Sequence, residues 1–167
     1  NDRFEADGFW YKITGEDTVQ LIRNPEETTG YGNPYPNAPA ALVIPETVTN
    51  RETGKTYTVT TIGYKAFFLC SQLTSVTLPD TIRVLGDYAF QTAWGTSSIT
   101  SMNLPEGLEE IGANALYYIP LDFKLPSTLK RIGNSAFAQS GITEVHFGDA
   151  IEAVDDRAFN FCKKLVK

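Results

Sequence analysis

A row of carboxylates is the first group in this 167-residue chain that could do chemistry. Each carboxylate directly follows a proline, or the glycine in its place, in successive copies of a repeat. In one copy a serine occupies this position. The row is Glu46, Asp80, Glu106, Ser127 and Asp149. Carboxylates stacked about 4.8 Å apart, the spacing of neighbouring strands, could gather a cation. No Asp-x-Asp-x-Asp-Gly calcium loop accompanies them in the sequence. The sequence therefore favours solvated caps of turns and predicts no metal site.

His146 is the only histidine, and with Glu144 and Asp149 it could form an acid–base set. Serine-based catalysis also needs a shaped nucleophile, and the sequence holds no Gly-x-Ser-x-Gly elbow. Asp155 and Asp156 are adjacent, so they should face opposite ways along a strand, unlike the convergent carboxylates of a glycosidase. There is also no phosphate loop, zinc-ligand spacing or dinucleotide fingerprint. We therefore expect no catalytic residue, no cofactor and no enzyme.

The two cysteines, Cys70 and Cys162, occupy the same position in two copies of the repeat, three residues after a Phe. Four steps of the repeat separate these copies, which is about 19 Å if copies stack at the strand spacing. A disulfide tolerates Cα separations of only about 4.4–6.8 Å. We therefore expect two buried free thiols that behave as small apolar residues.

The repeat that positions these side chains is an apolar residue and Pro, six more positions to an apolar residue and Gly, and then Ala-Phe. The clearest copy is LTSVTLPDTIRVLGDYAF, residues 73–90, and successive Ala-Phe elements lie 23, 26, 21 and 22 residues apart. A period of about 20–29 residues is typical of a stacked solenoid. Copies in equal phase should pair in parallel, so we predict one parallel sheet from strands near 74–77, 100–103, 122–125 and 143–146.

Other positions of the repeat have physical roles of their own. Proline cannot donate a ladder hydrogen bond, so it should end each strand. The glycine suits a sharp turn or a positive φ. The large residues of the Ala-Phe elements should stack from coil to coil as a buried ladder: Phe67, Phe90, Leu116, Phe137 and Phe159.

These motifs, Leu-x-x-Val-x-Leu-Pro, then Ile-Gly, then Ala-Phe and often Cys, resemble the BspA-like leucine-rich-repeat family of bacterial surface proteins. The resemblance covers about residues 41–167, with Leu116, Gly148 and Asp155 as departures that should make their coils irregular. It implies a leucine-rich-repeat solenoid, a right-handed superhelix. A short parallel β-sheet should line one side, and the opposite side should be mostly irregular or short-helical.

The N-terminal part, residues 1–40, is predicted to be a β-hairpin cap followed by a Pro/Tyr-rich loop. Residues 8–23 alternate around Gly15-Glu16-Asp17 as a hairpin does, and residues 24–40 hold four prolines and two tyrosines. A second hairpin is predicted over residues 47–60, turning near Thr53-Gly54. About five repeats should fill residues 41–167 and form one continuous domain with the cap, because a stack must cover its open end.

Two surfaces are candidates for binding. The exposed face of the predicted strands is the first, since repeat proteins use such faces for partners: Ser75, Thr77, Ser101, Asn103, Asp122, Lys124, Glu144 and His146. The second is a set of aromatic side chains that could stack on sugars or contact protein: Tyr31, Tyr35 and Trp94.

The function predicted first is a non-enzymatic, cell-surface or secreted bacterial binding module for protein–protein or adhesive interactions, as the resemblance implies. The alternative is a glycan-binding accessory module of a nutrient-capture system that uses the aromatics. A carboxylate-based hydrolase on the strand face is a third idea. The net charge of −6 argues against nucleic acid as a partner. No apolar run reaches the roughly 18 residues of a membrane span.

Overall fold

The computed structural model of the chain describes residues 2–93 and 95–166, and within them it has twelve β-strands and no helix. The strands are β1 (Arg3–Ala6), β2 (Phe9–Ile13), β3 (Thr18–Ile22), β4 (Ala41–Val43), β5 (Thr47–Thr49), β6 (Thr56–Ile62), β7 (Ser75–Thr77), β8 (Val84–Leu85), β9 (Ser101–Met102), β10 (Glu110–Ile111), β11 (Arg131–Ile132) and β12 (Ala153–Val154). The predicted short-helical side of the repeats is therefore wrong.

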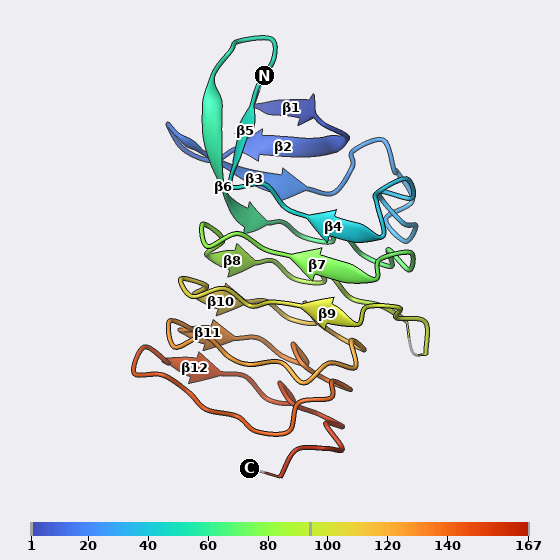
Figure 1. The fold of residues 1–167 in the computed structure, drawn as a ribbon, viewed down its shortest axis with the longest axis vertical. Helices are drawn as coiled ribbons and strands as arrows, with labels where there is room; N and C mark the ends of the chain where they lie inside the picture. The colour runs from blue at the N-terminus through green and yellow to red at the C-terminus, as the bar shows by residue number, and fades with distance from the viewer. Residues whose placement is uncertain (1, 94, 167) are drawn as a thin grey trace.

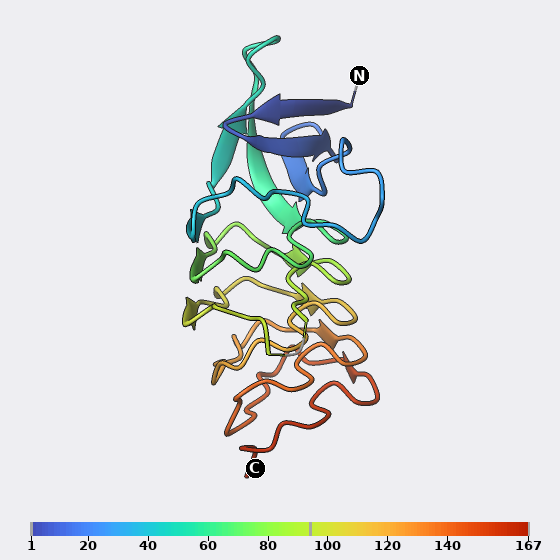
Figure 2. The same ribbon diagram turned by 90° about the vertical axis from the view of Figure 1, so that its right-hand side faces the viewer.

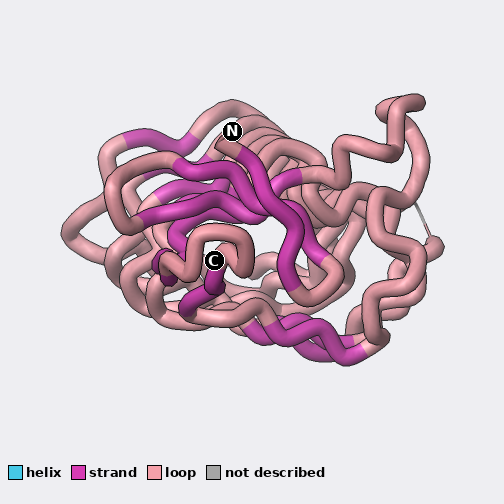
Figure 3. Tube along the Cα trace, turned by 90° about the horizontal axis from the view of Figure 1, so that it is seen from above, coloured by secondary structure: helices cyan, strands magenta, loops and turns pink. Residues whose placement is uncertain are grey.

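The strands form two sheets on different sides of a stack of coils (Figure 1 and Figure 2). The long sheet has the order β1-β2-β3-β6-β8-β10-β11-β12, with β5 paired to β6, and it is parallel from β3 to β12. The short sheet is β4-β7-β9, also parallel. Figure 3 looks down the stack and shows the strands gathered on separate sides, with loops between them.

The short sheet contains only part of what the sequence predicted. Strands β7 and β9 lie at two of the predicted positions and pair in parallel, as expected. Residues 122–125 and 143–146 are not strands, so the prediction was wrong there. The segment around 122–125 lies between Pro120 and Pro126, and proline removes backbone donors from a ladder. In addition, the carboxylate of Asp122 accepts the backbone N–H of Thr143 at 2.9 Å, where a strand would use a carbonyl.

The apolar-Gly element forms the long sheet instead of the turn that was predicted. Strands β8, β10 and β11 each end at the residue before a glycine, and none of these glycines has a positive φ. The glycine is needed because neighbouring coils approach closely: a Cβ added to Gly133 would lie 2.5 Å from the backbone N of Ala113. At Gly86 it would lie 2.9 Å from the carbonyl carbon of Gly63. A larger residue would push the coils apart.

Positive φ values occur two residues after this glycine, or after the Asp155 in its place: Lys65, Tyr88, Asn114, Ser135 and Arg157, with φ between 53° and 63°. From here the backbone runs without strand or helix, yet it is hydrogen-bonded from coil to coil. The N–H of Phe67 donates to Ala89 O and that of Phe90 donates to Ala115 O, each at 2.8 Å. These bonds satisfy backbone donors that would otherwise be buried without partners.

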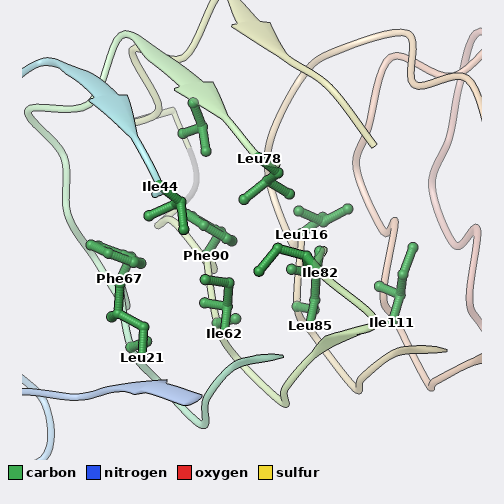
Figure 4. Close-up of a cluster of buried hydrophobic side chains, with 14 of the residues drawn as sticks. Leu21, Ile44, Ile62, Phe67, Leu78, Ile82, Leu85, Phe90, Ile111 and Leu116 are labelled. Carbon is green, nitrogen blue, oxygen red and sulfur yellow. The ribbon is translucent and has the colours of Figure 1, made fainter. Parts of the chain in front are cut away.

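The core is a column of apolar side chains between the two sheets, part of which is shown in Figure 4. Phe67, Phe90, Leu116 and Phe137 are buried as the ladder prediction required, and Phe159 is partly buried. The rings of Phe67 and Phe90 stack at 5.3 Å and 10°, and those of Phe137 and Phe159 stack at 5.4 Å and 4°. Leu116 breaks the ladder into these two ring pairs, because it supplies no ring between them.

The N-terminal cap is a three-stranded antiparallel unit joined to the repeats. The predicted hairpins are confirmed, since β2 pairs with β3 and β5 with β6, both antiparallel. Strand β1 and its hairpin to β2 were missed, although the turn residues Asp7 and Gly8, both with positive φ, are a common hairpin signal. The cap continues into the repeats where β3 pairs in parallel with β6. The division of the chain at residue 40 stays a prediction.

Candidate functional site

The face of the short sheet carries the first half of the predicted binding residues. Ser75 lies directly opposite Ser101 in register, and Thr77 lies opposite Val43. The side of this row nearest the cap is apolar, because Val43 is 64% exposed. The face therefore presents hydroxyl groups beside an exposed aliphatic side chain.

Asn103 follows β9 and is already engaged within the stack. Its amide nitrogen donates to the carbonyl of Leu78 at 2.9 Å, and its amide oxygen accepts the N–H of Leu78 at 2.8 Å. The side-chain amide of Asn103 thus makes the two hydrogen bonds between coils that the backbone of a strand residue would make. Only the second amide hydrogen and the second lone pair of the amide oxygen are left for a binding partner.

Asp122 also connects two coils. Besides the backbone N–H of Thr143, its carboxylate accepts the Oγ1–H of Thr143 at 3.0 Å and pairs with Lys124 at 3.2 Å. Donation from the Thr143 backbone, with smaller contributions from the Thr143 hydroxyl and Lys124, lowers the pKa of Asp122. Lys124 is the more available group, since its side chain is 78% exposed.

His146 and Glu144 form the end of this face. The Nε2 atom of His146 lies 2.9 Å from a carboxylate oxygen of Glu144, and both side chains are exposed. Asp149, the third member of the acid–base set considered from sequence, is not among the hydrogen-bond or ion-pair partners of His146 in the described residues. The pair is therefore a solvent-facing contact that a partner could also reach.

The row of carboxylates after the prolines serves turns in at least one place. Glu106 accepts the backbone N–H of Ser127 at 3.0 Å and its Oγ–H at 2.8 Å, one coil further on. These bonds lower the pKa of Glu106. Within residues 2–93 and 95–166, no three or more His, Cys, Asp or Glu side chains gather as a metal site would require.

Both cysteines are unpaired and buried, which confirms the prediction of free thiols. The Sγ–H of Cys70 donates to Asn33 Oδ1 at 3.0 Å, and that of Cys162 donates to Phe137 O at 3.1 Å. Burial raises the pKa of Cys70 to about 12. A thiol in that state is a poor nucleophile.

The aromatic set separates in the structure. Tyr35 is buried, and its hydroxyl donates to Ile22 O at 2.6 Å and accepts the backbone N–H of Trp10 at 3.0 Å. It is therefore a core residue of the cap and does not fit the role of an exposed sugar-stacking ring. Tyr31 is 77% exposed and remains available. Trp94 lies outside the described residues.

A cluster that the sequence reading missed surrounds Lys65. Its Nζ lies between 4.8 and 5.6 Å from the centroids of four rings: Tyr31, Tyr64, Phe68 and Tyr88. The ammonium also donates to Gly30 O at 3.1 Å. Cation–π attraction and this hydrogen bond attach the Pro/Tyr-rich loop to the first repeat. The only sequence signal was a tyrosine shortly after the repeat glycine in two copies, Tyr64 one residue after Gly63 and Tyr88 two residues after Gly86.

The outward face of the long sheet was missed as well. Arg131 pairs with Glu110 and with Glu152, one coil on either side, and Lys130 pairs with Glu109 at 3.2 Å. Exposed pairs of this kind are usually worth about 0–1 kcal/mol each. They therefore keep this part of the face charged without contributing much to stability.

Comparison with known proteins agrees with this geometry. The family model of the BspA type leucine rich repeat region matches residues 47–166 in six copies. The chain belongs to the BspA-type leucine-rich-repeat family. The sequence pattern had predicted this family, with about five repeats. No curated protein sequence matches the chain.

Solved structures of leucine-rich-repeat proteins share the fold. A leucine-rich repeat protein from Bacteroides ovatus is 28% identical with a TM-score of 0.72, covering 97% of this chain and 39% of that one. The leucine rich repeat protein of T. pallidum is 24% identical with a TM-score of 0.76, covering 97% of this chain and 68% of that one. A leucine rich cell surface protein from Faecalibacterium prausnitzii is 15% identical with a TM-score of 0.57, covering 99% of this chain and 53% of that one. The chain thus spans well under half of the Bacteroides ovatus protein. No helix among the described residues is long and apolar enough to cross a membrane.

Proposed function

We propose that this chain is a non-enzymatic binding module of a secreted or cell-surface bacterial protein, and that its partner is a protein. The observation that carries the proposal is the row of side chains in register across β4, β7 and β9, with the exposed side chains of Lys124, Glu144 and His146 in the coils that follow. Repeat proteins present such continuous faces to macromolecules. Family membership and the Faecalibacterium prausnitzii surface protein support a location outside the cell. We also propose that the coils wind as a right-handed solenoid, as is expected of this family.

Charge on this face is concentrated at the end away from the cap. Lys124 is highly exposed, and Glu144 and His146 reach solvent beside it. Toward the cap the face is hydroxyl-rich and then aliphatic at Val43. A protein partner fits this gradient, because protein interfaces combine an apolar part with a polar rim that steers association.

The test is a charge exchange, Lys124→Glu together with Glu144→Lys, which leaves the net charge of the chain at −6. Binding to a panel of immobilised extracellular-matrix proteins is followed by association kinetics at two salt concentrations. We expect slower association and a changed salt dependence, with thermal unfolding nearly unchanged. The control is the exchange of the exposed pair formed by Arg51, in the β5–β6 turn, and Asp7, in the β1–β2 turn. Unchanged kinetics in the Lys124 and Glu144 variant, on a matrix protein that binds wild type, would refute the proposal.

A second candidate function, a glycan-binding accessory module, is favoured by one observation. Tyr31 and Tyr64 are 77% and 57% exposed and flank the same lysine, Lys65. Exposed rings that are held in place are suited to stacking on sugar rings. The test is binding to an immobilised glycan array, where Tyr31→Ala should reduce retention and Phe161→Ala, at the far end of the stack, should not.

A further inference from the structure

A groove on the outside of the cap, between the long sheet and the start of the Pro/Tyr-rich loop, has the chemistry of a binding site. Its volume is about 300 Å³, at the lower end of the range of about 300–1,000 Å³ in which proteins seat small ligands. It is lined by charged and polar groups beside one exposed ring: Arg3, Lys12, Gln20, Arg23, Glu27 and Tyr64. None of these residues belongs to the short-sheet face.

Strand register explains why three of these side chains converge. Arg3 of β1 lies opposite Lys12 of β2, and Lys12 lies opposite Gln20 of β3. Directly opposed residues share one face of a sheet. Their neighbours Phe4 and Tyr11 point into the core, so this row faces outward. The antiparallel pairing of the cap aligns them, since they lie on three different strands.

The charge in the groove is opposite to that of the chain. Arg3, Lys12 and Arg23 are cationic, and Glu27 is the one carboxylate in the lining. Glu27 is paired with Arg23, and hydrogen bonds from Thr29 and Arg23 hold its pKa well below the usual range. The groove is therefore locally positive in a chain with net charge −6. Local positive charge attracts anionic groups of a ligand.

Arg23 and Gln20 have different roles in the lining. The terminal nitrogens of Arg23 donate to Glu27, to Gly32 O and to Lys65 O, and its Nε is buried, so Arg23 shapes the groove and does not offer a donor to a ligand. Gln20 adds an amide, a group that can both donate to and accept from hydroxyls.

Tyr64 supplies the aromatic part of the lining, beside the apolar side chains of Ile22 and Pro25. Its ring is 57% exposed and is held in place by an edge contact with Tyr88 at 5.9 Å and by Lys65 Nζ at 5.4 Å. A fixed ring loses little conformational entropy when a ligand stacks on it. Tyr31, on the other side of Lys65, extends this aromatic surface beyond the groove.

We propose that this groove binds an acidic saccharide, with a pyranose ring stacked on Tyr64 and its carboxylate or sulfate held by Lys12 beside the guanidinium of Arg3. Guanidinium and ammonium groups bind such anions through charge-assisted hydrogen bonds. A neutral glycan would make no use of the positive charge of Lys12, and a purely ionic ligand would make no use of the Tyr64 ring. This inference rests on the second candidate function and places its site in the groove beside Tyr64; it does not depend on the protein-binding proposal.

The test is calorimetric titration of the 167-residue chain with three acidic probes: a galacturonic acid tetramer, a sulfated chondroitin tetrasaccharide and sialyllactose. The fully methyl-esterified galacturonic acid tetramer is the uncharged match, and a single-stranded oligonucleotide is the non-saccharide anion. We expect at least one acidic probe to bind, the ester to bind at least about tenfold more weakly, and the oligonucleotide not to bind.

Two variants locate the site on that probe. Lys12→Gln and Tyr64→Ala should each weaken binding about tenfold. The matched controls Lys124→Gln and Phe161→Ala, both at exposed sites outside the groove, should bind like wild type. Circular dichroism and thermal unfolding verify that each variant is folded. Binding of no acidic probe, equal binding of the ester or of the oligonucleotide, or equal losses in the controls would each overturn the proposal. None of these outcomes bears on the Lys124 and Glu144 exchange, so the two proposals fail separately.

Discussion

The carboxylate of Asp122 accepts two hydrogen bonds from one residue of the next coil, from the backbone N–H of Thr143 at 2.9 Å and from its hydroxyl at 3.0 Å. Glu106 holds Ser127 in the same way, one coil earlier. In both places an acidic side chain replaces backbone pairing between coils that are not strands there. These two carboxylates are thus structural groups of the stack, and they are ionised when they do this work.

We expect the stack to lose stability in acid through these two groups. Their pKa values are lowered in the folded protein, while unfolded Asp and Glu titrate near about 3.9 and 4.3. The stabilisation is therefore complete above about pH 4.3 and is lost as the pH falls through the lowered folded values. Thermal unfolding of the double variant Asp122→Asn, Glu106→Gln should give a lower midpoint at pH 7 and a shallower decline toward pH 3 than wild type.

The control for this prediction is Asp149→Asn, since Asp149 belongs to the same row as Glu106 and has no hydrogen bond or ion pair within the described part of the chain. Its decline in acid should match that of wild type. If the unfolding midpoints of the double variant and wild type fell in parallel as the pH is lowered, Asp122 and Glu106 would not contribute to the pH dependence of stability.

The repeat phase predicted the column of the core but not the hydrogen bonding around it. Phe67, Phe90 and Phe137 were predictable because a small and a large residue recur in phase and must be buried by neighbouring coils. The two-residue strands were not, because Val84-Leu85 before a glycine has the same local pattern as a turn. Whether it pairs depends on how closely the next coil approaches, and the close approach at Gly112 comes from the stack as a whole.

The candidate site was predicted less well, for a similar reason. Tyr31 lies between glycines and Tyr35 between prolines, and neither context indicates which ring the cap covers. Tyr35 is buried because Phe9 and Phe67 pack against it, with ring centroids at 5.1 and 5.4 Å. The groove beside Tyr64 was also missed, since its residues come from four separate segments that only the β1-β2-β3-β6 order brings together.

Truncating Phe137, a buried ladder residue, should be costly to stability. Its side chain is fully buried, stacks on Phe159 at 5.4 Å and contacts Phe123 at 5.5 Å. Phe137→Ala should lower the free energy of unfolding by about 3–5 kcal/mol, the range for truncating a buried ring. Phe137→Leu should cost less, because Leu116 already fills the equivalent position of its coil. Denaturant unfolding measures both.

The control for Phe137 is Phe161→Ala, at a ring that is 61% exposed. Surface changes of this kind usually stay within about 0.5 kcal/mol. A loss below about 1 kcal/mol for Phe137→Ala would place that ring at a surface-like site and contradict the packing described above.

Both cysteines should resist thiol reagents in the folded protein. Cys70 is buried, its pKa is raised to about 12 by burial, and its thiol donates to Asn33. The reactive thiolate is therefore scarce at neutral pH. Labelling with a chromogenic disulfide reagent should be slow in buffer and should give two thiols per chain at once in denaturant. Rapid labelling of Cys70 in buffer, or a Cys70–Cys162 bridge in non-reducing mass analysis, would contradict this.

Removing the charge of Lys65 should loosen the Pro/Tyr-rich loop without unfolding the stack. The ammonium contacts four rings and the carbonyl of Gly30, and a cation–π contact is worth about 0.5–2 kcal/mol depending on its desolvation. Lys65→Met keeps an apolar stem of similar length but removes these attractions. Hydrogen exchange should therefore become faster at the amides of residues 30–32, while exchange in the long sheet stays slow.

The control is Lys55→Met, where the ammonium lies over the single ring of Tyr57 at 5.2 Å, far from this loop in the β5–β6 hairpin. If exchange at residues 30–32 were the same in Lys65→Met and wild type, Lys65 would not hold this part of the loop, and the bond from Arg23 to Gly32 O would be the better candidate.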